Sequence, residues 1–63
     1  MRKVTEGDFV STEYEGKILS GIITGARKSG EGKWFVQIAL ADMRIFICPA
    51  SELLDCVFVG DGE

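Results

Sequence analysis

The sequence contains no histidine, and this absence removes several kinds of catalytic and metal site. A histidine general base, a Ser-His-Asp triad and a His-containing zinc site all need an imidazole that one copy of the chain does not supply. Cysteine is also scarce, because Cys48 and Cys56 are too few for a secreted disulfide scaffold or for a zinc site of their own. We therefore expect no catalytic residues, no metal and no cofactor, and a protein that is not an enzyme.

The two thiols are expected to behave as small buried hydrophobic side chains. A reactive thiol needs a neighbour that lowers its pKa. The basic residue nearest to Cys48 in the sequence is Arg44, four positions away. The alternative to a buried structural role is that one of the two thiols is functional.

Long apolar runs and an excess of basic charge are lacking too. No apolar stretch approaches the roughly 20 residues that span a bilayer, and the polar segment after Met1 does not resemble a signal peptide. Seven Lys and Arg against ten Asp and Glu give a net charge of −3, which disfavours a broad basic surface for nucleic acid. We expect a cytoplasmic protein with reduced thiols and no membrane association. Such a short chain would suit an accessory protein of a mobile element or phage.

One proline and eight glycines separate segments that are rich in Val, Ile and Phe, a composition typical of β-strands. No window of 12 residues keeps a helical apolar period. The pattern predicts strands over residues 9–14, 17–27, 34–40, 44–48 and 56–59. Residues 49–54 are predicted to form a 3-10 turn, because Pro49 cannot donate to a strand ladder. We expect one domain over residues 1–63, with frayed ends at residues 1–6 and 60–63.

Glycines indicate where the predicted sheet turns and bends. Gly16 follows Glu15 in a predicted tight turn, where glycine takes the positive φ that a hairpin needs. Gly21 and Gly25 lie inside the long second strand, where we expect a bend or bulge that lets a small sheet curl over. The predicted fold is therefore all-β, a five-stranded SH3-like barrel with a short 3-10 turn before the last strand.

The chain resembles the SH3-like superfamily, which includes Tudor-like modules, in the order of these parts. The similar residues are Gly7-Asp8-Phe9-Val10 at the start, Gly21-Ile22-Ile23 in the second strand, and Pro49 followed by Leu53 ahead of the final strand.

Within that superfamily the stretch from Gly7 to Leu53 is distantly similar to the plasmid-borne type II dihydrofolate reductases. The shared positions are Gly7, Asp8, Val10, Gly21, Ile23, Gly25, Glu31, Gly32, Ile47, Pro49 and Leu53. That family forms a homotetramer around a pore lined by a Val-Gln-Ile-Tyr run, which here reads Ile45-Phe46-Ile47-Cys48. The substrate-binding glutamine is replaced by phenylalanine, so the resemblance implies assembly through this strand rather than reductase activity.

The chain carries more large apolar residues than a barrel of this size can bury. The residues expected to fill the interior are Val10, Ile23, Val36, Ile38, Ile45, Ile47, Leu53 and Val57. Ile22, Phe35 and Phe46 then lie on the opposite side of three successive strands, where alternation should be polar. We expect these three to form an interface with a second copy or another protein. Alternatively, a bulge shifts the alternation and places some of them in the core.

Two further pairs of residues could bind a ligand or a peptide. Tyr14 and Trp34 could form an aromatic cage or peptide groove, although Trp34 could equally pack at the edge of the core. Gln37 and Arg44 could line a pore between symmetric copies, which would make the protein a homo-oligomeric ligand-binding protein or enzyme.

Basic residues gather around the glycine-rich segment of residues 28–32. Arg27, Lys28 and Lys33 lie close to Trp34 in the sequence, which could provide phosphate contacts beside a ring for base stacking. Glu31 lies within this group, so a solvated loop is the simpler interpretation.

Overall fold

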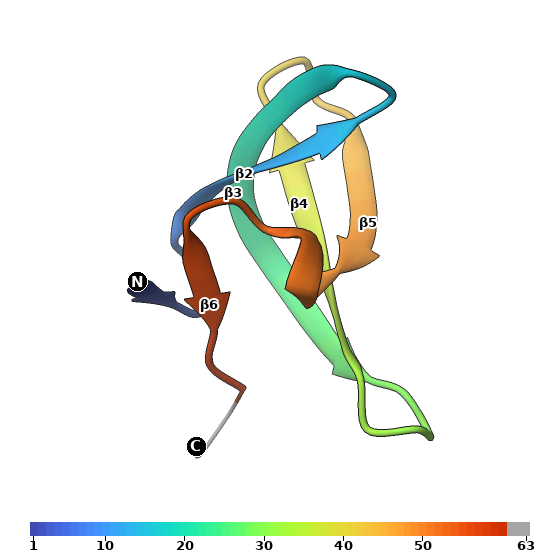
Figure 1. Cartoon of the computed structure of the whole chain (residues 1–63). Coiled ribbons are helices and arrows are strands. Elements are labelled where there is room, and N and C mark those ends of the chain that lie inside the picture. Colours follow the sequence, from blue (N-terminus) through green and yellow to red (C-terminus); the bar gives the residue numbers. More distant parts are fainter. Residues whose placement is uncertain (61–63) are drawn as a thin grey trace.

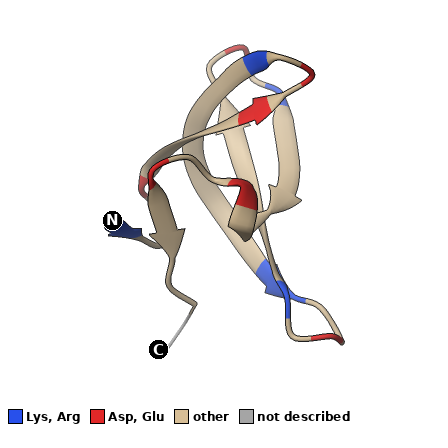
Figure 2. Ribbon diagram, viewed as in Figure 1, with Lys and Arg blue, Asp and Glu red and all other residues tan. Residues whose placement is uncertain are grey.

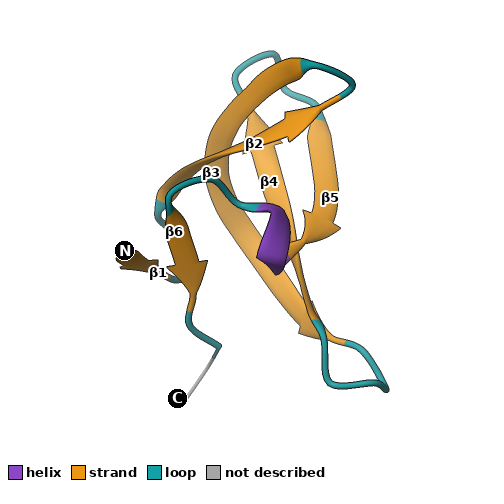
Figure 3. Ribbon diagram, viewed as in Figure 1, coloured by secondary structure: helices purple, strands orange, loops and turns teal. Residues whose placement is uncertain are grey.

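The computed structural model describes residues 1–60, and most of this part of the chain is strand (Figures 1 and 3). In chain order its elements are β1 (Arg2–Val4), β2 (Phe9–Tyr14), β3 (Lys17–Lys28), β4 (Trp34–Leu40), β5 (Ile45–Pro49), the 3-10 helix η1 (Ala50–Glu52) and β6 (Cys56–Phe58). The all-β class and the 3-10 turn before the last strand are confirmed. The expectation for residues 61–63 lies outside the described residues.

The strands form two sheets. An antiparallel sheet has the order β2-β3-β4-β5, and β1 pairs in parallel with β6. An isolated bridge between Thr12 and Leu53 joins β2 to the segment after η1, where the backbone N–H of Leu54 donates to the carbonyl of Ser11 at 2.9 Å. Within residues 1–60 these ladders do not close into a ring.

The N-terminal segment is ordered where we expected fraying. Val4 is 1% exposed and lies opposite Phe58 in the β1–β6 pair. The N–H of Val59 extends this pairing by donating to the carbonyl of Val4 at 2.8 Å. Two contacts hold residues 2–4 in place: β1 is the strand that pairs with β6, and the Val4 side chain packs in the core. Gly60 is also buried, directly against the ring of Trp34.

The long β3 curves around the sheet as its glycines predicted (Figure 1). Its register with β4 shifts between Ile23 and Gly25, which is the bulge expected there. The predicted turn before it is also confirmed, since Glu15 and Gly16 both have positive φ angles, of 52° and 79°. The curvature folds β2 over the inner side of the sheet.

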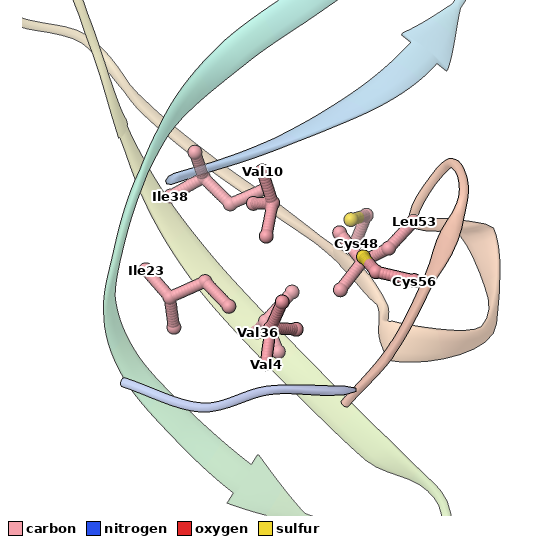
Figure 4. Packing of buried hydrophobic residues seen from close by; sticks show 8 residues of the cluster. All are labelled: Val4, Val10, Ile23, Val36, Ile38, Cys48, Leu53 and Cys56. Atoms are coloured by element: carbon pink, nitrogen blue, oxygen red, sulfur yellow. The ribbon is translucent and has the colours of Figure 1, made fainter. Parts of the chain in front are cut away.

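The core forms on the concave side of this sheet (Figure 4). Its buried apolar members are Val4, Val10, Ile23, Val36, Ile38, Cys48, Leu53 and Cys56. Thr12 is buried with them, and its hydroxyl donates to the carbonyl of Glu52 at 2.9 Å. The expectation that both cysteines are buried is confirmed.

Three residues assigned to the core from the sequence lie outside it. Ile45, Ile47 and Val57 are 53%, 62% and 48% exposed. In β5 the reason is its register with β4, which pairs Cys48 with the inward-facing Val36 and so turns both isoleucines outward. In β6, Cys56 is buried and its neighbour Val57 faces away.

We predict that Gly21 tolerates no side chain, whereas Gly25 does. A Cβ atom on Gly21 would overlap the backbone carbonyl of Ala39, which cannot move without breaking the β3–β4 ladder. Gly21→Ala should lower the free energy of unfolding by about 2 kcal/mol or more. Gly25→Ala, whose Cβ would lie 3.9 Å from that of Gln37, is the matched control. Urea denaturation of both variants measures this, and equal stability of the two would contradict it.

Candidate interaction surface

An apolar row crosses the convex side of the four-stranded sheet, opposite the core. The strand register places Phe9 beside Ile22, Ile22 beside Ala39, and Ala39 beside Ile45. One apolar side chain from each of the four strands therefore contributes to the row. Phe9 is 57% exposed and Ile22 is 40% exposed, so the row is open to solvent.

Further apolar residues flank this row. Ile47 lies opposite Gln37 and is 62% exposed, and Phe35 lies opposite Pro49. Ile18 continues the same side of β3 and is 60% exposed. We call the whole surface the outer face, and its members are Phe9, Ile18, Ile22, Phe35, Ala39, Ile45 and Ile47. A solvated sheet face normally alternates to polar residues, so an apolar patch here is typical of an interaction site.

The structure brings together two of the three residues predicted for the interface. Ile22 and Phe35 belong to the outer face. Phe46 does not, because it lies opposite Ile38 on the inner side, where its ring packs against Tyr14 with centroids 5.1 Å apart. Ile45 and Ile47 are the β5 residues that belong to the outer face. The sequence would have identified them if Cys48 had been taken as the buried residue and alternation counted from it.

The polar groups among the apolar side chains are already hydrogen-bonded within the sheet. The hydroxyls of Ser11 and Ser20 lie 2.7 Å apart, across β2 and β3. The amide Nε2 of Gln37 donates to Oγ1 of Thr24 at 3.2 Å, and that hydroxyl donates to the carbonyl of Gln37 at 3.3 Å. Covering the outer face therefore leaves few polar groups without a partner.

The two candidate cage aromatics lie in different places. Tyr14 lines a hollow of about 260 Å³ near the β2–β3 turn, together with Arg44 and Phe46. Trp34 lines a groove of about 670 Å³ beside η1 and β6, and its ring lies 5.5 Å from that of Phe58. One copy of the chain therefore does not combine Tyr14 and Trp34 into a single cage.

The two candidate pore residues are also separate within one copy. Gln37 lines a hollow of about 540 Å³ on the outer face, with Arg27 and Ile47. Arg44 lies at the β4–β5 turn, where its Nε donates to Oδ2 of Asp42 at 2.7 Å. The backbone N–H and guanidinium of Arg44 lower the pKa of the Asp42 carboxyl.

The basic residues cluster as expected at the end of the β3–β4 hairpin. Arg27 lies opposite Phe35 and Lys28 lies opposite Trp34 in the ladder. Lys33 immediately precedes β4 and lines the same groove as Trp34. The N–H groups of Glu31 and Lys33 donate to the hydroxyl of Ser29, which orders the turn between the strands.

Burial governs the chemistry of the thiols. Burial raises the pKa of the Cys48 thiol, a hydrogen bond with Thr12 opposes this, and the negative charge of Glu52 adds to it. A raised pKa leaves little thiolate at neutral pH, so this thiol is a weak nucleophile.

We predict that both thiols react slowly in the folded protein. At pH 8 their labelling by a disulfide reagent should be on the order of a hundredfold slower than in denaturant, because reaction needs an opening of the core. The rate at Cys48, measured in a Cys56→Ala variant, should rise as the pH approaches its raised pKa. Equal rates in native and denaturing buffer would show that the core does not protect them.

Residues 1–60 contain no group of three or more Cys, Asp or Glu side chains that could hold a metal ion. No helix in this range has the length and hydropathy to cross a membrane. No protein-family model matches the sequence, and no curated protein or solved structure gives a significant match.

Proposed function

We propose that the protein is a small non-enzymatic interaction module that binds a second copy of itself through the outer face. The observation that carries the proposal is the apolar row of Phe9, Ile22, Ala39 and Ile45, which crosses all four strands of the sheet. Such a row has no role in the core, which lies on the other side of the same strands. Contact with a partner surface would remove the row from water.

The size of the outer face suits a weak self-association. Its exposed large residues are Phe9, Ile18, Ile22, Ile45 and Ile47. Burying the exposed part of one such side chain contributes about 1 kcal/mol, so ten of them from two copies contribute on the order of 10 kcal/mol. Association costs about 4–15 kcal/mol in lost freedom. We therefore expect a dimer with a dissociation constant in the micromolar range or weaker.

We also propose that the fold is SH3-like. The order of strands, the bulged long β3 and η1 before the last strand support an SH3-like arrangement, in which η1 and β6 close the side of the sheet that holds the core. Domains of this size commonly gain stability from association, because one small core supplies little. Self-association would supply that stability here.

We predict that Ile47→Asp weakens the dimer at least tenfold. A symmetric interface would contain two such charges, and each would lose its hydration on burial. Val57→Asp is the matched control, since Val57 is also a half-exposed β-branched residue but lies on β6, outside the four-stranded sheet that carries the apolar row. Sedimentation equilibrium from 10 µM to 1 mM measures the mass against 6.9 kDa for one copy.

Three results would count against the outer face. A wild-type protein that stays monomeric at 1 mM would exclude self-association as proposed. A dimer that is weakened by Val57→Asp and not by Ile47→Asp would place the interface in the groove beside η1 instead. Loss of the native circular dichroism spectrum in Ile47→Asp would mean that Ile47 stabilises the monomer, and Ile45→Asp then repeats the test.

A further inference from the structure

Charge is distributed unevenly along the sheet, with one sign favoured at each end (Figure 2). The β3–β4 hairpin end carries Arg27, Lys28 and Lys33, with Glu31 as its acid. The opposite end holds the β2–β3 and β4–β5 turns, which lie next to each other around one hollow. Its charged residues are Glu13, Glu15, Asp42, Lys17 and Arg44.

Ion pairing makes the second end acidic in effect. Arg44 is held by Asp42 at 2.7 Å, so the two charges compensate each other. Glu13 and Glu15 remain, against the single charge of Lys17. The sheet therefore has a basic hairpin end and a more weakly acidic turn end, separated by the length of β3.

We propose that two copies pack outer face to outer face with their strands antiparallel, so that the hairpin end of each copy lies against the turn end of the other. This inference rests on the proposed self-association and specifies its orientation. A two-fold axis along the apolar row, perpendicular to the strands, produces this arrangement. The same axis places the row of one copy directly on the row of the second.

The strand register makes the two charged ends equidistant from that axis. Arg27 lies at the level of Phe35, four residues along β4 from Ala39 in the row. Glu13 lies at the level of Ile18, four residues along β3 from Ile22 in the row. Both levels are thus about 13 Å from the row, on opposite sides. Rotation about the row brings Arg27 of one copy to the level of Glu13 in the second.

The alternative two-fold axis, parallel to the strands, would bring like ends together. The hairpin end of each copy would meet the hairpin end of the other, and the two turn ends would likewise meet. Like charges that face each other across an interface oppose association. Charge complementarity therefore selects the antiparallel orientation between two packings that bury the same apolar row.

Paired charge reversals test this orientation. One variant carries Arg27→Glu and Lys28→Glu, a second carries Glu13→Lys and Glu15→Lys, and a third carries all four substitutions. In the antiparallel dimer, either reversal alone sets like charges against each other at both ends, and we expect a dissociation constant about tenfold higher. The fourfold variant again places opposite charges against each other, so its dissociation constant should return to the wild-type value. Each contact occurs twice in a symmetric dimer, which doubles the effect of every reversal.

Net charge alone predicts a different result. Reversing the two glutamates changes the net charge from −3 to +1, which lowers the general repulsion between copies. The orientation nevertheless predicts a weaker dimer for this variant. Sedimentation equilibrium at 50 mM and 500 mM NaCl completes the test, since screening should reduce the differences among the four proteins.

The outcomes separate this inference from the function on which it rests. A wild-type dimer that Ile47→Asp weakens, but whose dissociation constant neither charge reversal changes, would overturn the antiparallel orientation and leave the outer-face dimer standing. The absence of any dimer at 1 mM would overturn both. Weakening by each reversal with recovery in the fourfold variant is the supporting result.

Discussion

The register between β4 and β5 is the constraint on which the rest of the structure depends. Pairing of Val36 with Cys48 and of Ile38 with Phe46 decides which half of β5 faces the core. Because side chains alternate along a strand, a slip of one residue would exchange the inner and outer sets completely. The observed register buries a small thiol and exposes two isoleucines. The β5 part of the outer face follows from that choice.

The concave side of the sheet has room for small side chains at this position. Cys48 shares the core with Leu53, which follows η1, and with Cys56, which begins β6 (Figure 4). Interiors are packed to nearly crystalline density, so a larger residue here would displace its neighbours. The aromatic ring of Phe46 lies at the rim instead, against Tyr14. The register therefore turns Phe46 and Cys48 inward and Ile45 and Ile47 outward, although the isoleucines are strongly apolar.

Much of the fold was predictable because its signals are local. Glu15-Gly16 specified a turn, the glycines of β3 marked its bulge, and Pro49 ended β5 before the 3-10 helix. The β1–β6 pair was not predictable in this way, since it joins Arg2–Val4 to Cys56–Phe58 across almost the whole sequence. Three-residue strands carry too little periodicity to identify themselves. The pairing with β6 and the burial of Val4 distinguish β1 from a frayed terminus, and both depend on the folded structure.

The sequence predicted that an apolar interaction surface exists, but it identified only some of the residues that form it. An excess of apolar residues over the capacity of a small core can be inferred from composition and alternation, and Ile22 and Phe35 were found in this way. Assigning β5 required its register, because Ile45 and Ile47 are more apolar than Cys48 and alternation alone favours burying them. Phe9 was missed although the sequence contains the signal for it. Val10 was assigned to the interior, and alternation from Val10 places Phe9 on the opposite side of the strand.

An exposed row of this kind also favours uncontrolled association between many copies. β5 is the edge of the four-stranded sheet, and edge strands with apolar side chains invite uncontrolled pairing. Pro49 at the end of β5 removes one backbone donor from that edge, and the net charge of −3 opposes close approach of many copies. In the proposed dimer, face-to-face packing about a two-fold axis would use up the apolar row in a closed pair. Residues 1–60 would then offer no second row of this kind to a third copy, so the residues proposed to promote association would also limit it.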